Sequence, residues 1–294
     1  MTASPRRLLG ATLLGLTASL AASGASAADL NARDFFTAPV GTSLGVFYLP
    51  AVRADEFRGA HGTDKDAELT VNAFAWRQLW FSDLCGTLCT PQFIIPLADI
   101  EARLPGSTAH RSEQGLGDPQ FGGTLFFIND PERRTYSGLL TLIGAPLGEY
   151  HAGNPDVSPG ANRWTATFNY NYTQGVGENW VLEANLEAQL YGKNDDYHGM
   201  DLEQDPLYRL QAFASYDFTP ASYGALRLIH ADGGELSLDG DTLDGTHQRY
   251  TQLGFELGHW LDQKNQLLFA LSRNLDTDNG FHGEQALLRL VHVF

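Results

Sequence analysis

Apolar and polar residues alternate along residues 162–191. The first run places Trp164, Ala166, Phe168, Tyr170 and Tyr172 at every second position. After a glycine-containing break at residues 175–179 the alternation resumes, with Leu182 and Leu186 opposite Glu183 and Glu187. A period of two predicts strands, because successive side chains point to opposite faces of a sheet. Each run has the roughly 9–11 residues that a tilted strand needs to cross a bilayer, although a soluble sandwich gives the same alternation.

The rest of the chain favours a membrane barrel over a sandwich. Strand-like segments recur twelve times, and the connections between them alternate between short turns and long, polar, acidic loops, as in outer-membrane barrels. The predicted fold class is all-β, a closed antiparallel transmembrane barrel of about 12 strands. The predicted strands cover residues 42–52, 68–80, 91–104, 117–129, 135–147, 164–174, 180–191, 206–218, 222–233, 248–260, 265–275 and 283–294.

The N-terminal 27 residues predict export. Two arginines precede an apolar run that ends in small residues, Ala25-Ser26-Ala27, which is typical of a secretory signal peptide. We therefore expect a signal peptide at residues 1–27 and one barrel domain at residues 28–294, with Sec-type export to the outer membrane of a Gram-negative cell. Residues 28–41 are expected to form a lead into the first strand.

Net charge and cysteine content limit the possible partners and cofactors. Removal of residues 1–27 leaves 17 basic and 35 acidic residues, a net charge of −18, so nucleic acid is excluded as a partner. The two cysteines, Cys85 and Cys89, are expected to form a short-loop disulfide after export, because no ligand at metal spacing accompanies them. No metal or other cofactor is expected.

Charged and amide side chains on the polar strand faces must point into the barrel, since each mid-membrane arginine facing lipid costs roughly 2–4 kcal/mol. They are predicted to line a permeation path, and the alternative is that they fill and rigidify the lumen. The residues are Arg163, Glu183, Asn185, Glu187, Gln189, Arg209, Gln211, Asp217, Arg227, Gln252 and Glu256.

Motifs for catalysis and metal binding are weak. Residues 239–245 resemble a calcium loop, but Tyr250 stands where the last carboxylate ligand is required, which leaves a loose cation site as the alternative to a solvated loop. His230 and His247 could approach one another across a hairpin, which keeps an outer-membrane lipid hydrolase as a further alternative. We expect no enzyme.

Several short motifs carry a family resemblance along nearly the whole mature chain. They include Gly115-Leu116-Gly117-Asp118-Pro119, Asn162-Arg163-Trp164, Gln204-Asp205-Pro206-Leu207-Tyr208, Phe218-Thr219-Pro220 and the terminal Phe294. The chain resembles the outer-membrane transporters associated with the meta-pathway of phenol degradation. Ala161 departs from the acidic residue expected before Asn162, and His292 departs from the apolar residue expected near the C-terminus.

The resemblance implies an outer-membrane channel for small aromatic or hydrophobic compounds. The C-terminal strand ending in Phe294 also resembles that of outer-membrane barrels in general, which implies that the barrel-assembly machinery reads it. The expected partners are outer-membrane lipids and lipopolysaccharide, that machinery and a small-molecule substrate. A plugged structural or adhesive barrel is the alternative from another functional class.

Overall fold

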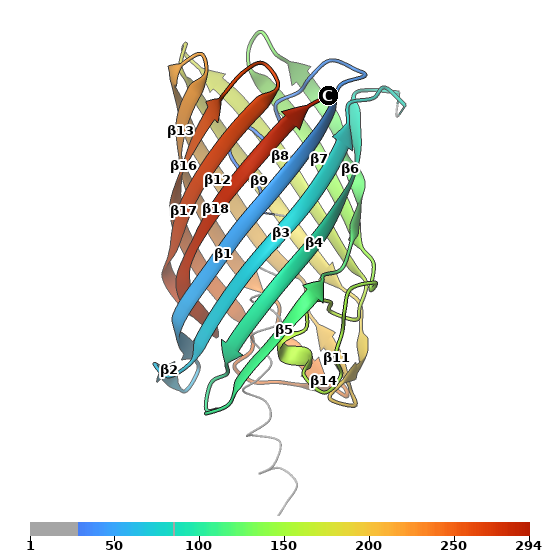
Figure 1. Ribbon diagram of the computed structural model, residues 1–294, viewed down its shortest axis with the longest axis vertical. Coiled ribbons are helices and arrows are strands. Elements are labelled where there is room, and N and C mark those ends of the chain that lie inside the picture. The colour runs from blue at the N-terminus through green and yellow to red at the C-terminus, as the bar shows by residue number, and fades with distance from the viewer. Residues whose placement is uncertain (1–28, 85) are drawn as a thin grey trace, which may run out of the picture.

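Twelve antiparallel strands form one closed barrel (Figure 1). The computed structural model describes residues 29–84 and 86–294. Closure follows from the pairing of the first strand with both the last strand and the next one along the chain. The barrel strands are β1 (Ser43–Gly59), β3 (Glu68–Trp80), β4 (Cys89–Arg103), β6 (Gln120–Asp130), β7 (Thr135–Gly144), β8 (Thr165–Val176), β9 (Trp180–Tyr191), β12 (Leu207–Thr219), β13 (Ser222–Gly233), β16 (Gln248–Trp260), β17 (Asn265–Asp278) and β18 (Gly280–Val293). The predicted fold class and strand number are confirmed.

The two faces of the barrel wall differ as the alternation predicts. Phe168 and Leu186 lie on the outer face, 38% and 61% exposed, whereas Glu187 on the inner face is 4% exposed. A sandwich would bury the two apolar side chains and leave the carboxylate in water. Closure also pairs the backbone groups at the sheet edges, each of which would cost several kcal/mol if left unpaired in hydrocarbon.

The two ends of the barrel carry different connections. The end that holds Phe294 has the turns at residues 131–134, 177–179, 220–221 and 261–264 (Figure 1). Longer connections lie at the opposite end, which by the usual asymmetry of outer-membrane barrels faces outward. One predicted long loop, residues 276–282, is wrong: β17 and β18 extend through it. Asn279 alone separates them and turns the chain with a left-handed φ of 54°.

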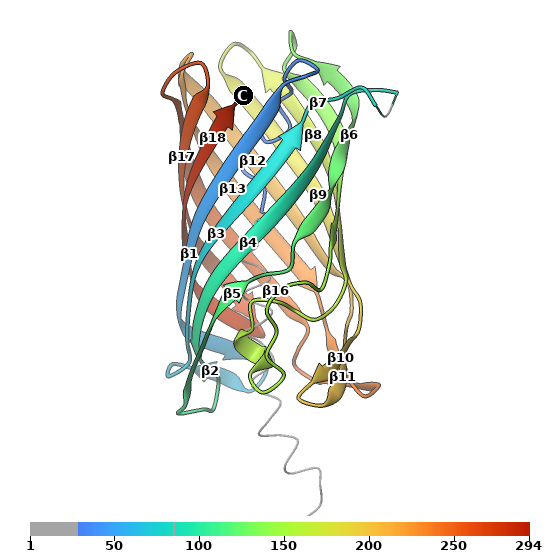
Figure 2. The ribbon, with the colours of Figure 1, turned by 45° about the vertical axis from the view of Figure 1, so that its right-hand side comes forward.

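Further strands occupy connections that the polar sequence predicts as loops. β5 (His110–Leu116) pairs with β4, and a separate four-stranded sheet lies at the outward end (Figure 2). This sheet packs Tyr197, Leu202 and Leu236 in a small core of its own. Its strands are β10 (Asn194–Tyr197), β11 (Met200–Gln204), β14 (Leu236–Leu238) and β15 (Asp241–Thr242), while β2 (Gly62–Asp64) extends the β1 ladder. The described residues hold one short helical turn, η2 (Pro155–Val157), and no helix long and apolar enough to cross a membrane.

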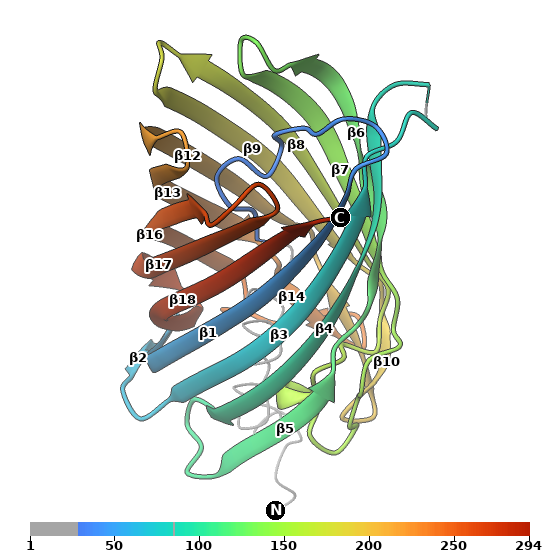
Figure 3. The ribbon, with the colours of Figure 1, turned by 45° about the horizontal axis from the view of Figure 1, so that its top comes forward.

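The segment before β1 lies inside the barrel. Viewed with the short-turn end brought forward, this blue chain runs within the ring of strands (Figure 3). Leu30, Ala32 and Phe35 are at most 3% exposed and pack in one core with wall residues such as Val46 and Leu142. The expectation of a simple lead into the first strand is therefore wrong, because residues 29–36 form a plug. The predicted signal peptide and Cys85 of the predicted disulfide lie outside the described residues.

Candidate functional site: a plugged lumen with two cavities

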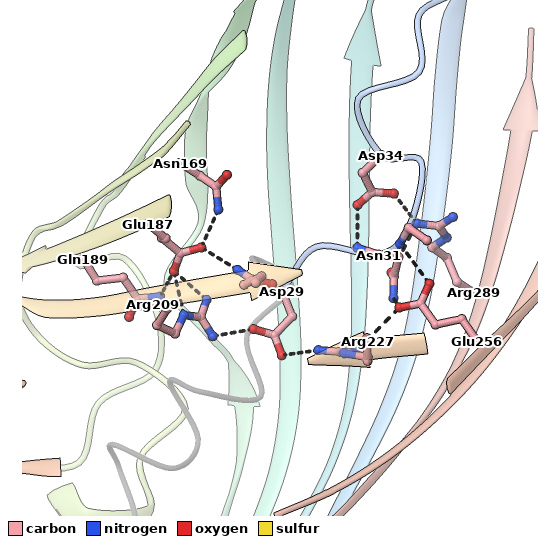
Figure 4. Close-up of polar contacts among 12 residues, drawn as sticks. Asp29, Asn31, Asp34, Asn169, Glu187, Gln189, Arg209, Arg227, Glu256 and Arg289 are labelled. Carbon is pink, nitrogen blue, oxygen red and sulfur yellow. Dashed lines mark hydrogen bonds and ion pairs between the residues drawn. The ribbon is translucent and has the colours of Figure 1, made fainter. Parts of the chain in front are cut away.

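Two acidic side chains of the plug (residues 29–36), Asp29 and Asp34, meet arginines of the wall (Figure 4). Arg209 Nη1 donates to Asp29 Oδ1 at 2.6 Å, and Arg227 Nη2 lies 3.5 Å from the other oxygen of the same carboxylate. Arg289 Nη1 donates to Asp34 Oδ1 at 2.5 Å. The lumen arginines are therefore neutralised in part by a segment distant in sequence.

Wall carboxylates hold the plug backbone. Glu256 accepts from the backbone N–H of Ala32 at 2.9 Å and from Asn31 Nδ2 at 3.0 Å. Glu183 accepts from the backbone N–H of Arg33 at 2.9 Å. Both carboxylates are buried, so these hydrogen bonds compensate for the hydrogen bonds to water that each carboxylate loses on burial.

Arg33 fixes the plug near the short-turn end. Its Nη1 donates to Asp217 Oδ1 at 2.6 Å, its Nε donates to Ser215 Oγ at 3.1 Å, and its guanidinium carbon lies 4.0 Å from the ring centroid of Tyr223. The backbone of Arg33 is left-handed, with a φ of 72°. This conformation is unusual for a residue other than glycine and is held here by contacts on three sides.

A second network surrounds Glu187. Arg209 donates Nε to Glu187 Oε1 at 2.8 Å, and the side-chain amides of Asn169, Gln189 and Gln211 donate to the same carboxylate at 2.8–2.9 Å. Because Arg209 also holds Asp29, this network continues into the plug.

The sequence-predicted lumen residues therefore fall into several groups. Glu187, Gln189, Arg209 and Gln211 form one network, Arg227 and Glu256 form an ion pair that joins it through Asp29, and Glu183 and Asp217 hold Arg33. Asn185 bonds Asn171 within the wall, Gln252 lines a cavity, and Arg163 lies apart, bonded to Gln204. All face inward. Their role along a permeation path stays a prediction.

Sequence reasoning missed the plug residues and Arg289. In the last strand Arg289 stands between Leu288 and Leu290, a polar position on an alternating strand, so the period of two could have found it. Asp29, Arg33 and Asp34 lie outside any periodic segment. No local pattern distinguishes them from a solvated lead.

Two adjoining cavities remain on the outward side of the plug. The vestibule, about 120 Å³, is lined by Asp29 at its plug side and by wall residues that include Val52, Ile229 and Tyr250. The side chamber, about 130 Å³, lies beneath β1, β3 and β4 and is bounded by residues 117–120 and 158–165. Gln189 and Tyr191 line both cavities and so form the partition between them.

Three outward connections meet at Asp156, which is 1% exposed. Its carboxylate accepts from Arg111 Nη1 at 2.6 Å and from the hydroxyl of Tyr197, and His198 Nε2 lies 3.4 Å away. Burial, followed by the charge of Asp156, raises the pKa of Tyr197, which keeps this hydroxyl a donor. The cluster joins η2, β5 and β10 into one cap over the cavities.

Replacement of this carboxylate should loosen the cap and spare the barrel. We expect Asp156→Ala to make the connections around residues 104–109 and 145–164 sensitive to protease, because Arg111 and Tyr197 lose a buried partner at a cost of about 1–3 kcal/mol. Limited proteolysis of the folded protein measures the effect, with the exposed Asp244→Ala as control. A cleavage pattern like that of the wild type, in a variant that still migrates as a folded barrel, would contradict it.

The histidines give no catalytic arrangement within the described residues. His230 Nδ1 lies 3.0 Å from Thr251 Oγ1, and His247 Nε2 lies 3.2 Å from Asp232 Oδ1. Both histidines are exposed, and no serine hydroxyl bonds either one in the described part of the chain. In the same part of the chain, no group of three or more His, Cys, Asp or Glu side chains is arranged to hold a metal ion.

Fold and lumen together define an outer-membrane β-barrel. The chain belongs to the family described as "Putative MetA-pathway of phenol degradation", whose model matches residues 52–290. It is similar in structure to the COG4313 outer membrane channel from Pseudomonas putida F1, with 27% identity, a TM-score of 0.84 and coverage of 90% of this chain and 100% of that one.

The similarity to other barrels is limited to the fold. The translocator domain of the autotransporter NalP from Neisseria meningitidis has 9% identity, a TM-score of 0.57 and coverage of 95% of this chain and 99% of that one. The β domain of the Bordetella autotransporter BrkA has 10% identity, a TM-score of 0.54 and coverage of 86% and 100%. No curated protein sequence matches the chain.

Proposed function

We propose that this barrel is a channel for small hydrophobic compounds, aromatic ones included, and not an enzyme. The observation that carries the proposal is the pair of cavities on the outward side of the plug. Each has a volume near the 150 Å³ of an engineered protein cavity that holds one benzene molecule. Their walls mix apolar side chains with a few polar groups, as ligand sites usually do. The structurally similar protein from Pseudomonas putida F1 adds support, since it is an outer membrane channel.

The plug argues against free passage of hydrophilic solutes through the lumen. Residues 29–36 fill the lumen between the cavities and the short-turn end and are held by charged hydrogen bonds. A compound that binds in the cavities would have to displace part of the plug or leave by another route. A permanently plugged structural or adhesive barrel is the alternative, and it predicts no flux of any solute.

Uptake by intact cells tests this function. A deletion strain should take up radiolabelled toluene or naphthalene several-fold more slowly than the same strain carrying the wild-type gene, while uptake of glucose stays unchanged. Equal uptake of every apolar compound by the two strains would contradict the channel and favour the plugged structural or adhesive barrel. Replacement of His230 and His247 with Ala, with lipid turnover measured before and after, tests the hydrolase alternative.

A hollow on the outer surface supports lipopolysaccharide as the neighbouring lipid. Arg53 and Arg273 are exposed, point outward and stand on either side of Glu284 across β18. Neither arginine forms an ion pair within the described residues. The hollow between them is lined by Leu226, Leu253, Phe255 and Leu271, so acyl chains and phosphates of one lipid find matching surfaces.

Loss of these arginines should weaken binding of a phosphorylated lipid. The variant R53Q/R273Q should lose about 1 kcal/mol for each arginine, a combined factor of about 30 in affinity for lipid A. Native mass spectrometry of the purified barrel with lipid A and with phosphatidylethanolamine measures the selectivity. The rim variant R103Q is the control. Unchanged selectivity in R53Q/R273Q would argue against the site.

The C-terminal residue is the proposed mark for the barrel-assembly machinery. Phe294 is 65% exposed and follows β18, the strand that closes the barrel. We expect Phe294→Ala to lower the amount of assembled barrel in the outer membrane, measured as the heat-modifiable fraction on a gel. Leu261→Ala, an exposed apolar residue at the same end, should not. Equal assembly of the two variants would count against the role.

A further inference from the structure

The side chamber has two unlike walls. One wall is apolar and comes from β1, β3 and β4, with Pro50, Val71, Ala75 and Ile100 among its residues. The other wall is polar and includes Asp118, Gln120, Arg163, Thr167 and Tyr191. Water alone would suit the polar wall but not the apolar one, which matches the ring of an organic compound.

Arg163 is a buried cation with unused hydrogen-bonding capacity. Its side chain is held on two sides, since Nη2 donates to Gln204 Oε1 at 2.5 Å and the guanidinium carbon lies 4.6 Å from the ring centroid of Tyr191. Arg163 is 5% exposed, and its Nη1 has no hydrogen-bond partner among the described residues. A buried donor without an acceptor is costly, so a partner from a ligand would be favourable.

Gln120 presents the complementary group to the same chamber. Its Oε1 is buried and has no donor within the described part of the chain. Both side chains therefore line one small cavity, and each carries a buried polar atom without a partner in the described part of the chain. A hydroxyl group can satisfy both, because it accepts through a lone pair and donates its proton.

The charge of the chamber disfavours an anion. Asp118 lines it too, and its two carboxylate oxygens accept from the backbone N–H groups of Gly148 and Ala161 at 2.9 and 2.8 Å. The carboxylate offsets the charge of Arg163, so an anionic ligand would gain little net attraction and would meet a like charge.

We infer that the side chamber binds one small ring compound through an uncharged hydroxyl group, which accepts a hydrogen bond from Arg163 Nη1 and donates one to Gln120 Oε1. The ring lies against the apolar wall. This inference rests on the proposed function in naming which compounds the channel retains, and it makes Arg163 and Gln120 the residues that set their specificity.

Three matched probes test the inference on the full-length mature barrel in detergent. Fluorine NMR gives the affinities for 4-fluorophenol, 4-fluorotoluene and 4-fluorobenzoate at pH 7, with protein-free micelles as the blank for partitioning. The wild type should bind the phenol about tenfold more tightly than the toluene, as expected for a hydrogen bond to a charged donor, and the benzoate most weakly.

Variants assign the preference to the two side chains. R163M should bring the ratio of the phenol and toluene affinities to about one, R163K should restore part of it, and Q120M should lower it several-fold. R103M, at the outward rim, should leave the ratio unchanged. If R163M does not fold, R163K and Q120M carry the test, and heat-modifiable mobility reports folding.

Three results would overturn the inference. They are equal binding of phenol and toluene by the wild type, an undiminished ratio in R163M and Q120M, or tighter binding of benzoate than of phenol. Equal binding of phenol and toluene with intact cellular uptake would leave the channel standing and remove only the hydroxyl specificity. Failure of every ring probe to bind, with unchanged uptake in the deletion strain, would remove the proposed function itself.

Discussion

Removal of residues 29–36 should turn the barrel into an open pore. The deletion empties the lumen beside Glu183, Arg209, Arg227 and Glu256, whose charges then hydrate. A twelve-stranded barrel is wider than the eight-stranded barrels that side chains alone can fill, so we expect single-channel conductance in planar bilayers to rise by about tenfold or more. Entry of small hydrophilic antibiotics into cells should rise with it.

Two controls separate the plug from a general disturbance of the barrel. Deletion of residues 239–245, an outward connection, should leave conductance near the wild-type value. The point variant D29N/R33M/D34N keeps the length of the segment but removes its charged contacts, and it should open intermittently. Conductance that stays low after deletion of residues 29–36, in a protein that still folds, would show that the wall closes the lumen by itself.

Arg209→Met should be the most destabilising single substitution among the lumen charges. The change leaves Glu187 buried without its cation, and the side chains of this pair are 2% and 0% exposed. Removal of one partner of a buried ion pair costs about 3–5 kcal/mol, because the remaining charge cannot regain water. Denaturant unfolding in lipid vesicles, followed by tryptophan fluorescence, measures the free energy of unfolding.

The double variant R209M/E187M gives the matched comparison. It removes both charges and should recover much of the lost stability, since apolar replacements of a buried pair are often neutral or better. At the rim, Arg103→Met breaks the pair with Glu68, whose side chain is 52% exposed, and should cost no more than about 1 kcal/mol. A free energy of unfolding of R209M within 1 kcal/mol of the wild type would mean that water reaches Glu187.

The wall of the barrel could be predicted because the alternation that defines each strand lies within that strand's own sequence. The alternation around Phe168 and Leu186 assigns one face of each strand to lipid, and Glu187 must then face inward. The cost of a charge in hydrocarbon makes this assignment unambiguous. The number of strands followed from the same periodic segments, whereas the family resemblance rested mainly on motifs in turns and at strand ends.

Strand ends were predicted less well, because polar residues are compatible with both a loop and a strand in water. β17 and β18 continue to either side of Asn279, and β5 and β10 form where the polar sequence predicts loops. β10 pairs with β11, which in turn pairs with β14 of another connection, and side chains of three connections meet at Asp156. The alternation of apolar and polar residues is needed only where one strand face contacts lipid, so it does not mark the strand ends in water.

The sequence by itself determined an exported chain whose strands close into a ring with charged groups inside. Only the tertiary structure decided what fills that ring. Arg209 and Arg227 meet Asp29, and Arg289 meets Asp34, across 180 to 255 positions of chain. Such pairs form only once the barrel closes, because closure places the inward-facing side chains of all strands around one lumen. Residues 29–36 have no periodic pattern that would indicate their place in that lumen.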